Sequence, residues 1–287
     1  MCIQPLLLVL ATSVVAGATS PGQLSRLVEE GLRHNPEVLA AQKRLEAARA
    51  EPAQPHAPPA EANADAARLR AAQSKAVSRV KQAYYRLHQA YVNEEVLEGD
   101  RELLRNLLSV TQENYSVGKA LQQDIFKAQV QVSLMNLRLI EAERDLRTCE
   151  TEINALVGRP ADSPAERPPD TKPAPIGVSL EELEAKATQA AHVEDGRATP
   201  YRIRDDYLIA ESAAKLMEIY STTILPQSRV AAHSALVSYE NGGADFLSVL
   251  TNYVTFFTAE SSYHEQVEQL FLALARLEEL TGVELIH

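Results

Sequence analysis

The feature that most constrains the fold of this chain is a turn that occurs twice, with a long helical pattern on each side. The first copy is the stretch YSVGKALQQDIFKAQ, residues 115–129, and the second is YENGGADFLSVLTNY, residues 239–253. An interval of 124 residues separates the members of three pairs: Tyr115 and Tyr239, Gly118 and Gly242, Ala120 and Ala244. The helical pattern after each turn stops at a glycine, Gly158 or Gly282, and these glycines are also 124 residues apart. Equal turns followed by equal helices indicate an internal duplication.

The helical pattern after each turn carries an apolar stripe in which gaps of three and four residues alternate. After the first turn the stripe consists of Ile125, Ala128, Val132, Met135, Leu139, Ala142, Leu146, Cys149, Ile153 and Leu156. At the equivalent positions after the second turn stand Val249, Asn252, Phe256, Ala259, Tyr263, Gln266, Leu270, Ala273, Leu277 and Leu280. Such gaps mark the a and d positions of a heptad repeat, which imposes left-handed supercoiling. Because each turn is short, each pair of long helices is predicted to fold back as an antiparallel coiled-coil hairpin.

Proline and glycine divide the chain into predicted helices and breaks. The first expected helix begins at Ser20 and precedes Pro36. The other expected helices cover residues 36–49, about 64–116, about 121–157, 179–191, about 203–239 and about 246–280. The segments predicted to break the chain are the Pro-rich linkers 51–63 and 159–178 and the stretch GRATP, 196–200. Pro226 predicts a kink in its helix, and Ser179 with Glu182 has the spacing of a capping box. The helix at 64–116 would be roughly 80 Å long, far beyond an ordinary globular helix.

These patterns predict an all-α chain that consists of two repeats in one domain. The first helical repeat covers residues 19–158 and the second covers 179–287, with the linker 159–178 between them. Aromatic residues make up only 5% of the chain and Trp is absent, as is typical of long helices and coiled coils. Further apolar residues stand beside the first stripe: Val130, Leu134 and Leu137. Long hairpins with more than one apolar side cannot bury all of them in a monomer, so we expect an oligomer.

The first 18 residues have the pattern of a secretory signal peptide. An apolar run at 6–16 is followed by Ala16-Gly17-Ala18, which fits a small-x-small cleavage site. The run is too short to span a bilayer, and Cys2 does not lie at the cleavage point, so we expect neither a membrane helix nor a lipid anchor. We therefore expect export to the periplasm. Removal of the leader would leave Cys149 alone, without a partner for an intrachain disulfide.

Charge and motifs argue against several classes of function. The chain has 28 basic and 39 acidic residues, and its net charge of -11 argues against nucleic acid as a partner. We expect no enzyme and no cofactor, because the sequence has no Gly-rich phosphate loop, no H-E-x-x-H motif and no nucleophile elbow. We expect no metal site either. The stretch HVED, 192–195, is more typical of a solvated linker than of a metal site. Cys149 lies on the apolar stripe, which is more typical of a small buried side chain than of a metal ligand. His88, His233 and His264 lie on separate helical segments without ligand spacing.

The order of these segments resembles the outer membrane factor family, the TolC-like channels of tripartite efflux pumps and type I secretion. The matching stretches are GLRHNPEVLAAQKRLEAARA, VKQAYYRLHQAY, NYSVGKALQQDIFKAQVQ, EINALVGRP, YSTTILPQSRVAAHSALVSYENGGADFLSVLTNY and LARLEELTG. The resemblance implies a homotrimer in which duplicated long helices form a hollow α-barrel through the periplasm. It also implies a non-catalytic role in exporting small molecules, metal ions or proteins. The implied partners are a periplasmic adaptor protein and an inner-membrane pump.

The chain departs from the family pattern where the family carries pairs of β-strands that close into an outer-membrane barrel. The corresponding gaps, 51–63 and about 192–200, are Pro-rich or polar. A membrane strand takes about 9–11 residues and a hairpin with its turn roughly 25, so neither gap can hold one. We therefore expect no membrane β-barrel. Association with the outer membrane is implied by the resemblance, whereas integral insertion is not expected.

Two functions fit these expectations. The first is a periplasmic helical duct that docks with an adaptor in an efflux or type I secretion system. The alternative is a soluble periplasmic helical scaffold, or a truncated channel remnant, without transport activity.

The resemblance also assigns roles to the two turns, because in the family the hairpin tips form the closed entrance. Asp124 stands at a position that is acidic in the family. In the second turn the two such positions hold Ser248 and Thr251, and Asp245 lies three residues before the first of them. A threefold ring of either aspartate would attract cations at the entrance of a pore. Helix capping is the simpler prediction for both, since a carboxylate favours the start of a helix.

The turns also supply candidate contacts for the adaptor. Glycines at Gly118, Gly242 and Gly243 are expected to provide the positive φ that a tight turn after a helix requires. The candidate adaptor contacts are Lys119, Leu121, Ala244 and Phe246. Phe246 is the strongest of these, unless its ring packs within its own hairpin.

Overall fold

The computed structural model describes residues 22–50, 60–170, 176–189 and 199–286. In this part of the chain the helices are α1 Gln23–His34, α2 Pro36–Ala50, α3 Ala60–Ser116, α4 Gln122–Val157, α5 Leu180–Gln189, α6 Thr199–Ile219, the π-helix η1 Tyr220–Ile224, α7 Leu225–Glu240 and α8 Phe246–Thr281. The described residues contain no strand, which confirms the all-α prediction. The proposed signal peptide, most of the linker 51–63 and the stretch HVED lie outside the described residues.

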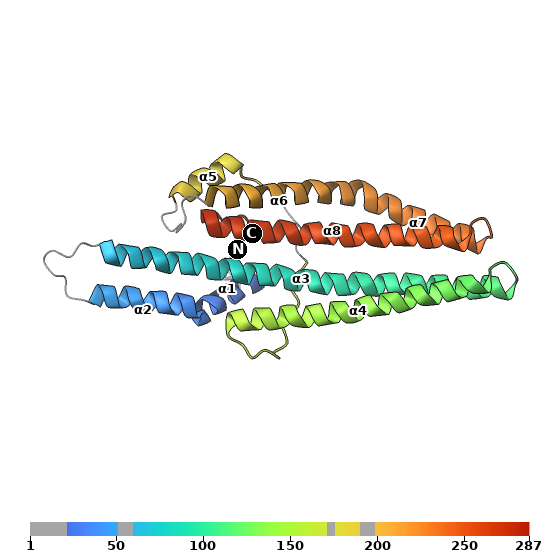
Figure 1. The fold of residues 1–287 in the computed structure, drawn as a ribbon, viewed down its shortest axis with the longest axis horizontal. Helices are drawn as coiled ribbons and strands as arrows, with labels where there is room; N and C mark the ends of the chain where they lie inside the picture. Colours follow the sequence, from blue (N-terminus) through green and yellow to red (C-terminus); the bar gives the residue numbers. More distant parts are fainter. Residues whose placement is uncertain (1–21, 51–59, 171–175, 190–198, 287) are drawn as a thin grey trace, which may run out of the picture.

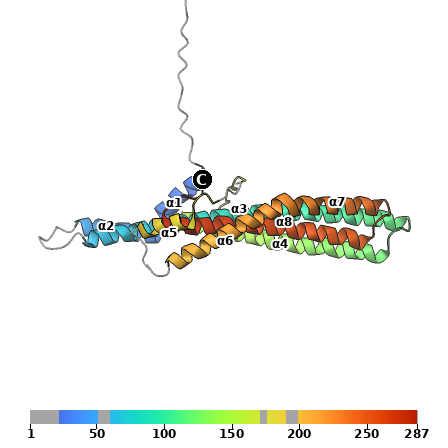
Figure 2. The same cartoon turned by 90° about the horizontal axis from the view of Figure 1, so that it is seen from above.

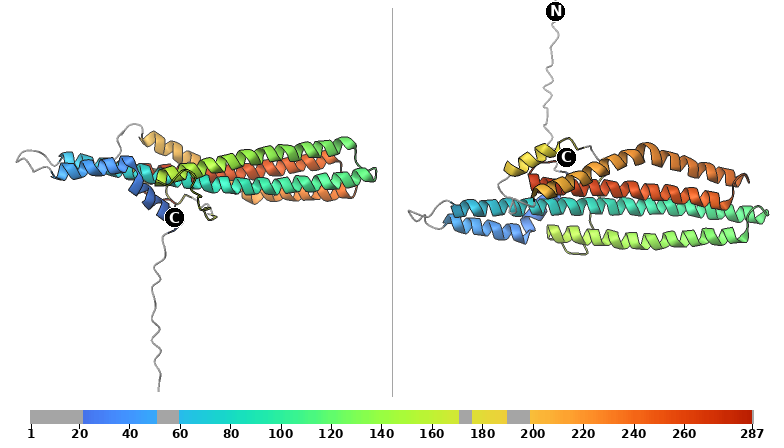
Figure 3. Two further views of the ribbon diagram at one scale, coloured as in Figure 1. Left: turned by 90° about the horizontal axis from the view of Figure 1, so that it is seen from below. Right: turned by 45° about the horizontal axis from the view of Figure 1, so that its top comes forward.

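The molecule is an elongated assembly of helices that run close to its long axis. The helix α3 has 57 residues, or about 85 Å, and it extends along most of the molecule. The helices α2 and α4 both pack against α3 and lie one after the other along it (Figure 1). The helix α8 packs against α3 on one side and against α6 and α7 on the other. As a result, α4 and the continuous α6–η1–α7 segment lie on opposite edges of the molecule (Figures 1 and 3).

The internal duplication is confirmed in the backbone. The helices α4 and α8 each contain 36 residues, and the bounds of α8 lie 124 residues after those of α4. The turns before them have φ of 75° at Gly118 and 76° at Gly242. The helices end at Gly158 and Gly282, whose φ values are 75° and 68°. A positive φ is nearly free of steric cost only for glycine, which explains why glycine stands at all four positions.

The two heptad stripes form the seams of the hairpins, as predicted. Every residue of both stripes is buried or half-buried in the single chain, including the two polar members Asn252 and Gln266. In contrast, Val130, Leu134 and Leu137 are exposed on α4. The heptad register therefore predicts burial within the chain, and the additional apolar positions remain uncovered in the monomer.

Two clusters of buried residues hold the hairpins together. One lies toward the turns and combines Leu107 of α3 and Met135 of α4 with Phe256 of α8. The other draws on both halves of the sequence, with Val80 from α3 and Leu277 from α8. The two repeats thus share their apolar core.

Several predicted boundaries differ from the structure. The helix α3 begins at Ala60, so the linker 51–63 is shorter than expected. Pro200 does not break the chain but lies in the first turn of α6, where its missing N–H costs no intrahelical hydrogen bond. The predicted interruption at Pro226 takes the form of the π-helix η1 directly before α7, which begins with Leu225. The wider π-helical turn accommodates Pro226, which has no backbone N–H to donate to the preceding turn of helix.

Side-chain caps agree with the predictions. The amide nitrogen of Ser179 donates to the Glu182 carboxylate over 3.1 Å, and the Ser179 hydroxyl oxygen accepts from the amide of Glu182 over 3.3 Å. This reciprocal pair is the predicted capping box at the start of α5. The Asn35 side chain accepts from the amides of Glu37 and Val38, so it caps α2 where Pro36 starts the helix.

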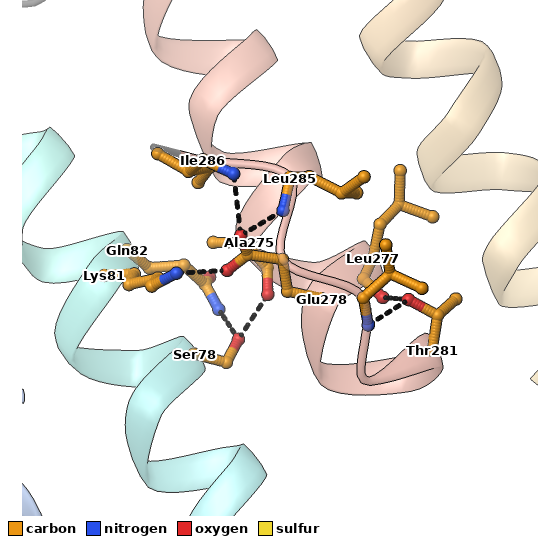
Figure 4. Close-up of polar contacts among 10 residues, drawn as sticks. Ser78, Lys81, Gln82, Ala275, Leu277, Glu278, Thr281, Leu285 and Ile286 are labelled. Carbon is orange, nitrogen blue, oxygen red and sulfur yellow. Dashed lines mark hydrogen bonds and ion pairs between the residues drawn. The ribbon is translucent and has the colours of Figure 1, made fainter. Parts of the chain in front are cut away.

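A polar cluster joins the first repeat to the second (Figure 4). Lys81 of α3 donates to one carboxylate oxygen of Glu278 in α8 over 2.6 Å. The other oxygen of Glu278 accepts from the backbone amides of Leu285 and Ile286, over 2.7 and 2.8 Å. Ser78 donates to the carbonyl oxygen of Ala275 over 3.0 Å. The cluster fixes the segment after α8 onto both repeats.

Candidate functional site

The first hairpin tip is a tight turn between α3 and α4. The amide of Gly118 donates to the carbonyl oxygen of Tyr115 over 3.0 Å, and the amide of Lys119 donates to the carbonyl oxygen of Asn114 over 2.8 Å. These two bonds satisfy carbonyl groups at the end of α3 that have no partner within the helix. Lys119 and Leu121 are exposed, and Leu121 has 61% of its surface accessible.

The second hairpin tip repeats this hydrogen-bonding pattern. The amide of Gly242 donates to the carbonyl oxygen of Tyr239 over 3.1 Å, and the amide of Gly243 donates to the carbonyl oxygen of Ser238 over 2.7 Å. Gly243 does not have a positive φ, so the prediction made for it is wrong in that respect. Its equivalent in the first tip is Lys119, which shows that a side chain is sterically allowed at that place in the turn. At Gly243, however, an added Cβ would lie 2.9 Å from the Ser238 hydroxyl oxygen.

The two tips lie together at one end of the molecule (Figure 2). The side-chain amide of Asn114, at the end of α3, donates to the carbonyl oxygen of Tyr239 at the end of α7 over 3.3 Å. Both residues are buried. The structure therefore brings two turns that are distant in sequence into one surface, and a buried hydrogen bond joins their helices.

Both aspartates in the tips accept a backbone hydrogen bond at the start of the following helix. Asp245 is the N-cap of α8 and accepts from the amide of Ser248 over 2.7 Å. Asp124 accepts from the amide of Leu121 over 3.3 Å, and Lys127 lies 3.5 Å from its carboxylate. Capping thus engages both carboxylates in the single chain. The Thr251 hydroxyl donates within its own helix, to the carbonyl oxygen of Leu247.

Phe246 does not offer its ring to a partner. Only 3% of its surface is exposed, and the ring packs against Tyr239 with the ring centres 6.3 Å apart. Of the two roles expected for this residue, the structure therefore shows packing within its own hairpin. Ala244 is half-buried. Of the four candidate adaptor contacts, Lys119 and Leu121 are therefore the exposed ones.

A groove of about 1120 Å³ lies between the two hairpins and extends from His88 on α3 to Glu240 at the end of α7. Its walls come from α3, α7 and α8, and Arg167 and Asp170 of the segment before α5 lie at its edge. His88, His233 and His264 all line this groove. This proximity is not predictable from the sequence, because the three histidines follow no ligand spacing and their helices meet only in the folded chain.

The groove contains titratable groups that burial perturbs. Burial, and then the neighbouring Glu260, raise the pKa of Asp100 to about 7, against the opposing effect of Arg138. Burial also raises the pKa of Glu260. The pKa of His88 is lowered by burial, and that of His264 by burial and by His88. Both imidazoles are therefore neutral at pH 7.

A metal site among the described residues would need several ligand side chains that converge on one point. In that part of the chain no group of three or more His, Cys, Asp or Glu side chains is placed to hold one. Burial raises the pKa of Cys149 to about 11, so its thiol is protonated at pH 7 and is a poor ligand. Within the same residues, no helix is both long and apolar enough to cross a membrane.

Comparison by sequence gives no relative, since no family model and no curated protein matches the chain. Comparison by structure gives clear matches to channels. The outer-membrane channel OprN superposes with a TM-score of 0.69 at 16% identity, over 90% of this chain and 89% of OprN. The outer membrane protein VceC from Vibrio cholerae has a TM-score of 0.72 at 15% identity, over 92% of this chain and 97% of VceC.

A third match is CusC, described in connection with transmembrane channel formation. Its TM-score is 0.64 at 13% identity, over 93% of this chain and 96% of CusC. At such low identity the likeness concerns the fold. The chain therefore has the fold of TolC-like outer-membrane channels, as its sequence resemblance predicts.

Proposed function

We propose that this chain forms the periplasmic helical duct of an efflux or type I secretion system, as a closed ring of three copies. The two repeats act in it as one unit. The proposal is supported by the likeness to channel structures and by the exposed apolar surface of the hairpins.

The observation that carries the proposal is a pair of exposed apolar stripes on opposite edges of the molecule. On α4 the stripe consists of Phe126, Val130, Leu134, Leu137 and Ile140. At about 100° per residue these side chains face away from the buried seam of the same helix. On the α6–η1–α7 segment the exposed apolar residues are Leu208, Leu216, Ile219, Val230 and Val237.

Two different apolar edges on one chain favour a head-to-tail contact between copies. A contact of this kind closes into a ring when the rotation between neighbours allows it. If no neighbouring copy covered it, an exposed apolar stripe of five side chains would promote aggregation. The number of three copies comes from the family resemblance.

The tips are the proposed entrance and adaptor surface. Lys119 and Leu121 offer exposed contact surface on the first tip. Asp124 and Asp245 remain the candidates for an acidic ring, with Ser248 and Thr251 exposed nearby. A carboxylate that caps a helix keeps its charge, so capping and cation attraction are compatible at one residue.

Mass measurement of the purified mature chain tests the ring. We expect a trimer for the wild type and a monomer for the double variant Val130→Glu/Leu137→Glu, because two buried charges would face the neighbouring copy. Glu143→Lys, on the same helix beside the stripe, is the control and should stay trimeric. A stable wild-type monomer at micromolar concentration would refute the ring.

Transport is tested separately in cells. A deletion strain should become more susceptible to at least one toxic organic compound or metal ion, and the wild-type gene should restore resistance where the double variant does not. Unchanged susceptibility across such a panel, together with a wholly soluble periplasmic protein, would favour the non-conducting scaffold instead.

A further inference from the structure

The groove between the hairpins has apolar walls and an acidic interior. Its apolar surface comes from Val96 and Leu103 on α3, from Leu236 on α7 and from Phe256 on α8. Its volume of about 1120 Å³ slightly exceeds the roughly 300–1,000 Å³ of pockets that hold small organic ligands. The groove lies within one chain, so it requires no neighbouring copy.

Asp100 is a buried carboxyl group in the groove, and Arg138 on α4 is the base whose charge acts on it. Asp100 is 4% exposed, and the described residues place no cationic group within 4.0 Å of it. A buried carboxylate without a cationic partner is costly, and a bound cation would offset that cost. At the end of the groove nearer the turns, Glu240 likewise has no ion pair with a described residue.

The two arginines that line the groove, Arg167 and Arg229, are already engaged. Arg229 lies 3.7 Å from Glu260, and its guanidinium stands over the ring of Phe256 at 5.3 Å. Arg167 lies 2.6 Å from Glu95 and 3.9 Å from Asp170. The surplus of charge in the groove is therefore negative.

An unpaired imidazole adds a hydrogen-bonding group. The Nε2 atom of His88 is buried and has no hydrogen-bond partner among the described residues; the carboxylate of Asp170 lies 4.0 Å away. His88 lines the groove together with His264. A neutral imidazole nitrogen can accept a hydrogen bond from an ammonium N–H.

From these observations we propose that the groove binds an organic ammonium ion with an apolar body. The apolar part would lie on the walls, and the charged nitrogen would meet Asp100 and Glu260. The aromatic rings of Tyr253 and Phe256 on the same side would attract the cation further. The proposal concerns the isolated chain, so it stands or falls independently of ring formation and export.

Acidification should weaken binding, because protonated carboxyl groups lose their charge for the cation. Asp100 has a pKa of about 7, so it changes from mostly ionised at pH 8 to mostly protonated at pH 6. The other titratable and charged groups around the groove are His88 and Glu95 on α3, Arg138 on α4, Arg229, His233 and Glu240 on α7, Glu260 and His264 on α8, and Arg167 and Asp170 before α5. Protonation of His88 or His264 on acidification would add positive charge, which acts in the same direction.

Fluorescence anisotropy of the cationic dye rhodamine 6G with the purified chain tests the site. The anionic dye fluorescein serves as the comparison. We expect micromolar binding of rhodamine 6G at pH 8, no comparable binding of fluorescein, and weaker binding at pH 6. Asp100→Asn and Glu260→Gln should each reduce the affinity about tenfold. Glu113→Gln, an exposed change elsewhere on α3, should leave it unchanged.

Circular dichroism of each variant separates a lost site from a lost fold. Equal affinity for the two dyes, or no binding of rhodamine 6G at about 100 μM, would overturn the proposal. It would also be overturned if folded Asp100→Asn and Glu260→Gln both bound within twofold of the wild type.

Discussion

At the residue scale, burial matters most where the sequence shows an ordinary polar residue. Asp100 lies in a helix that the sequence predicts, among charged neighbours, and nothing local distinguishes it from an exposed aspartate. In the structure it is 4% exposed beside Glu260. Its chemistry is therefore set by residues 160 positions away.

This position makes a pH-dependent prediction about stability. A carboxyl group whose pKa is raised in the folded state favours folding when protonated, and this contribution is lost as the pH rises through about 7. Asp100→Asn should therefore raise the melting temperature at pH 8 by about 2–4 °C, and by less at pH 5. Thermal melts followed by circular dichroism measure this, with Glu113→Gln as the exposed control. An equal shift at both pH values would contradict the role of Asp100 ionisation.

At the element scale, close packing between helices constrains single residues that the heptad pattern does not mark. Gly31 of α1 is buried where that helix meets α3. A Cβ at this position would lie 2.7 Å from a methyl carbon of Val80, a distance that real Cβ contacts do not reach. Sequence alone shows only a glycine in a helical pattern, which would be read as a weak point of the helix.

The prediction at this scale compares two glycines. Gly31→Ala should destabilise the protein by about 1–3 kcal/mol, because overpacking against Val80 outweighs the better helix propensity of alanine. Gly99→Ala in α3 has open space around its Cβ and should instead stabilise by about 0.5–1 kcal/mol. Urea unfolding measures both changes. A stabilising Gly31→Ala would show that the two helices can separate at little cost.

At the scale of the whole molecule, the two repeats are joined by buried polar contacts as well as by the shared core. The Lys81–Glu278 pair has side chains only 11% and 9% exposed. The exposed pair Arg147–Glu143 on α4 has the same separation of 2.6 Å. The distance between the charged atoms is thus equal, whereas the exposure of the two pairs differs widely.

Removal of one partner should show this difference. Lys81→Met should cost about 3–5 kcal/mol, because Glu278 would be left buried without its cation. Glu278→Gln combined with Lys81→Met should cost less than Lys81→Met alone. Arg147→Gln should change stability by less than about 1 kcal/mol. The free energies of unfolding of these variants give the coupling energy, and similar losses for Lys81→Met and Arg147→Gln would refute the role of burial.

The sequence by itself determined the helices, the two turns, the duplication and the seams, because each depends on residues a few positions apart. The period of the apolar stripe sets the buried face of α4 and α8, and glycine at positive φ sets the ends. Only the tertiary structure decided that the hairpins lie side by side, that Phe246 turns inward, and that His88, His264, Asp100 and Glu260 meet in one groove. The contacts between the hairpins and across the groove join residues more than a hundred positions apart along the chain, and such pairs leave no periodic signal in a single sequence. The contact of Phe246 with Tyr239 is closer in sequence, but it depends on how the second turn folds.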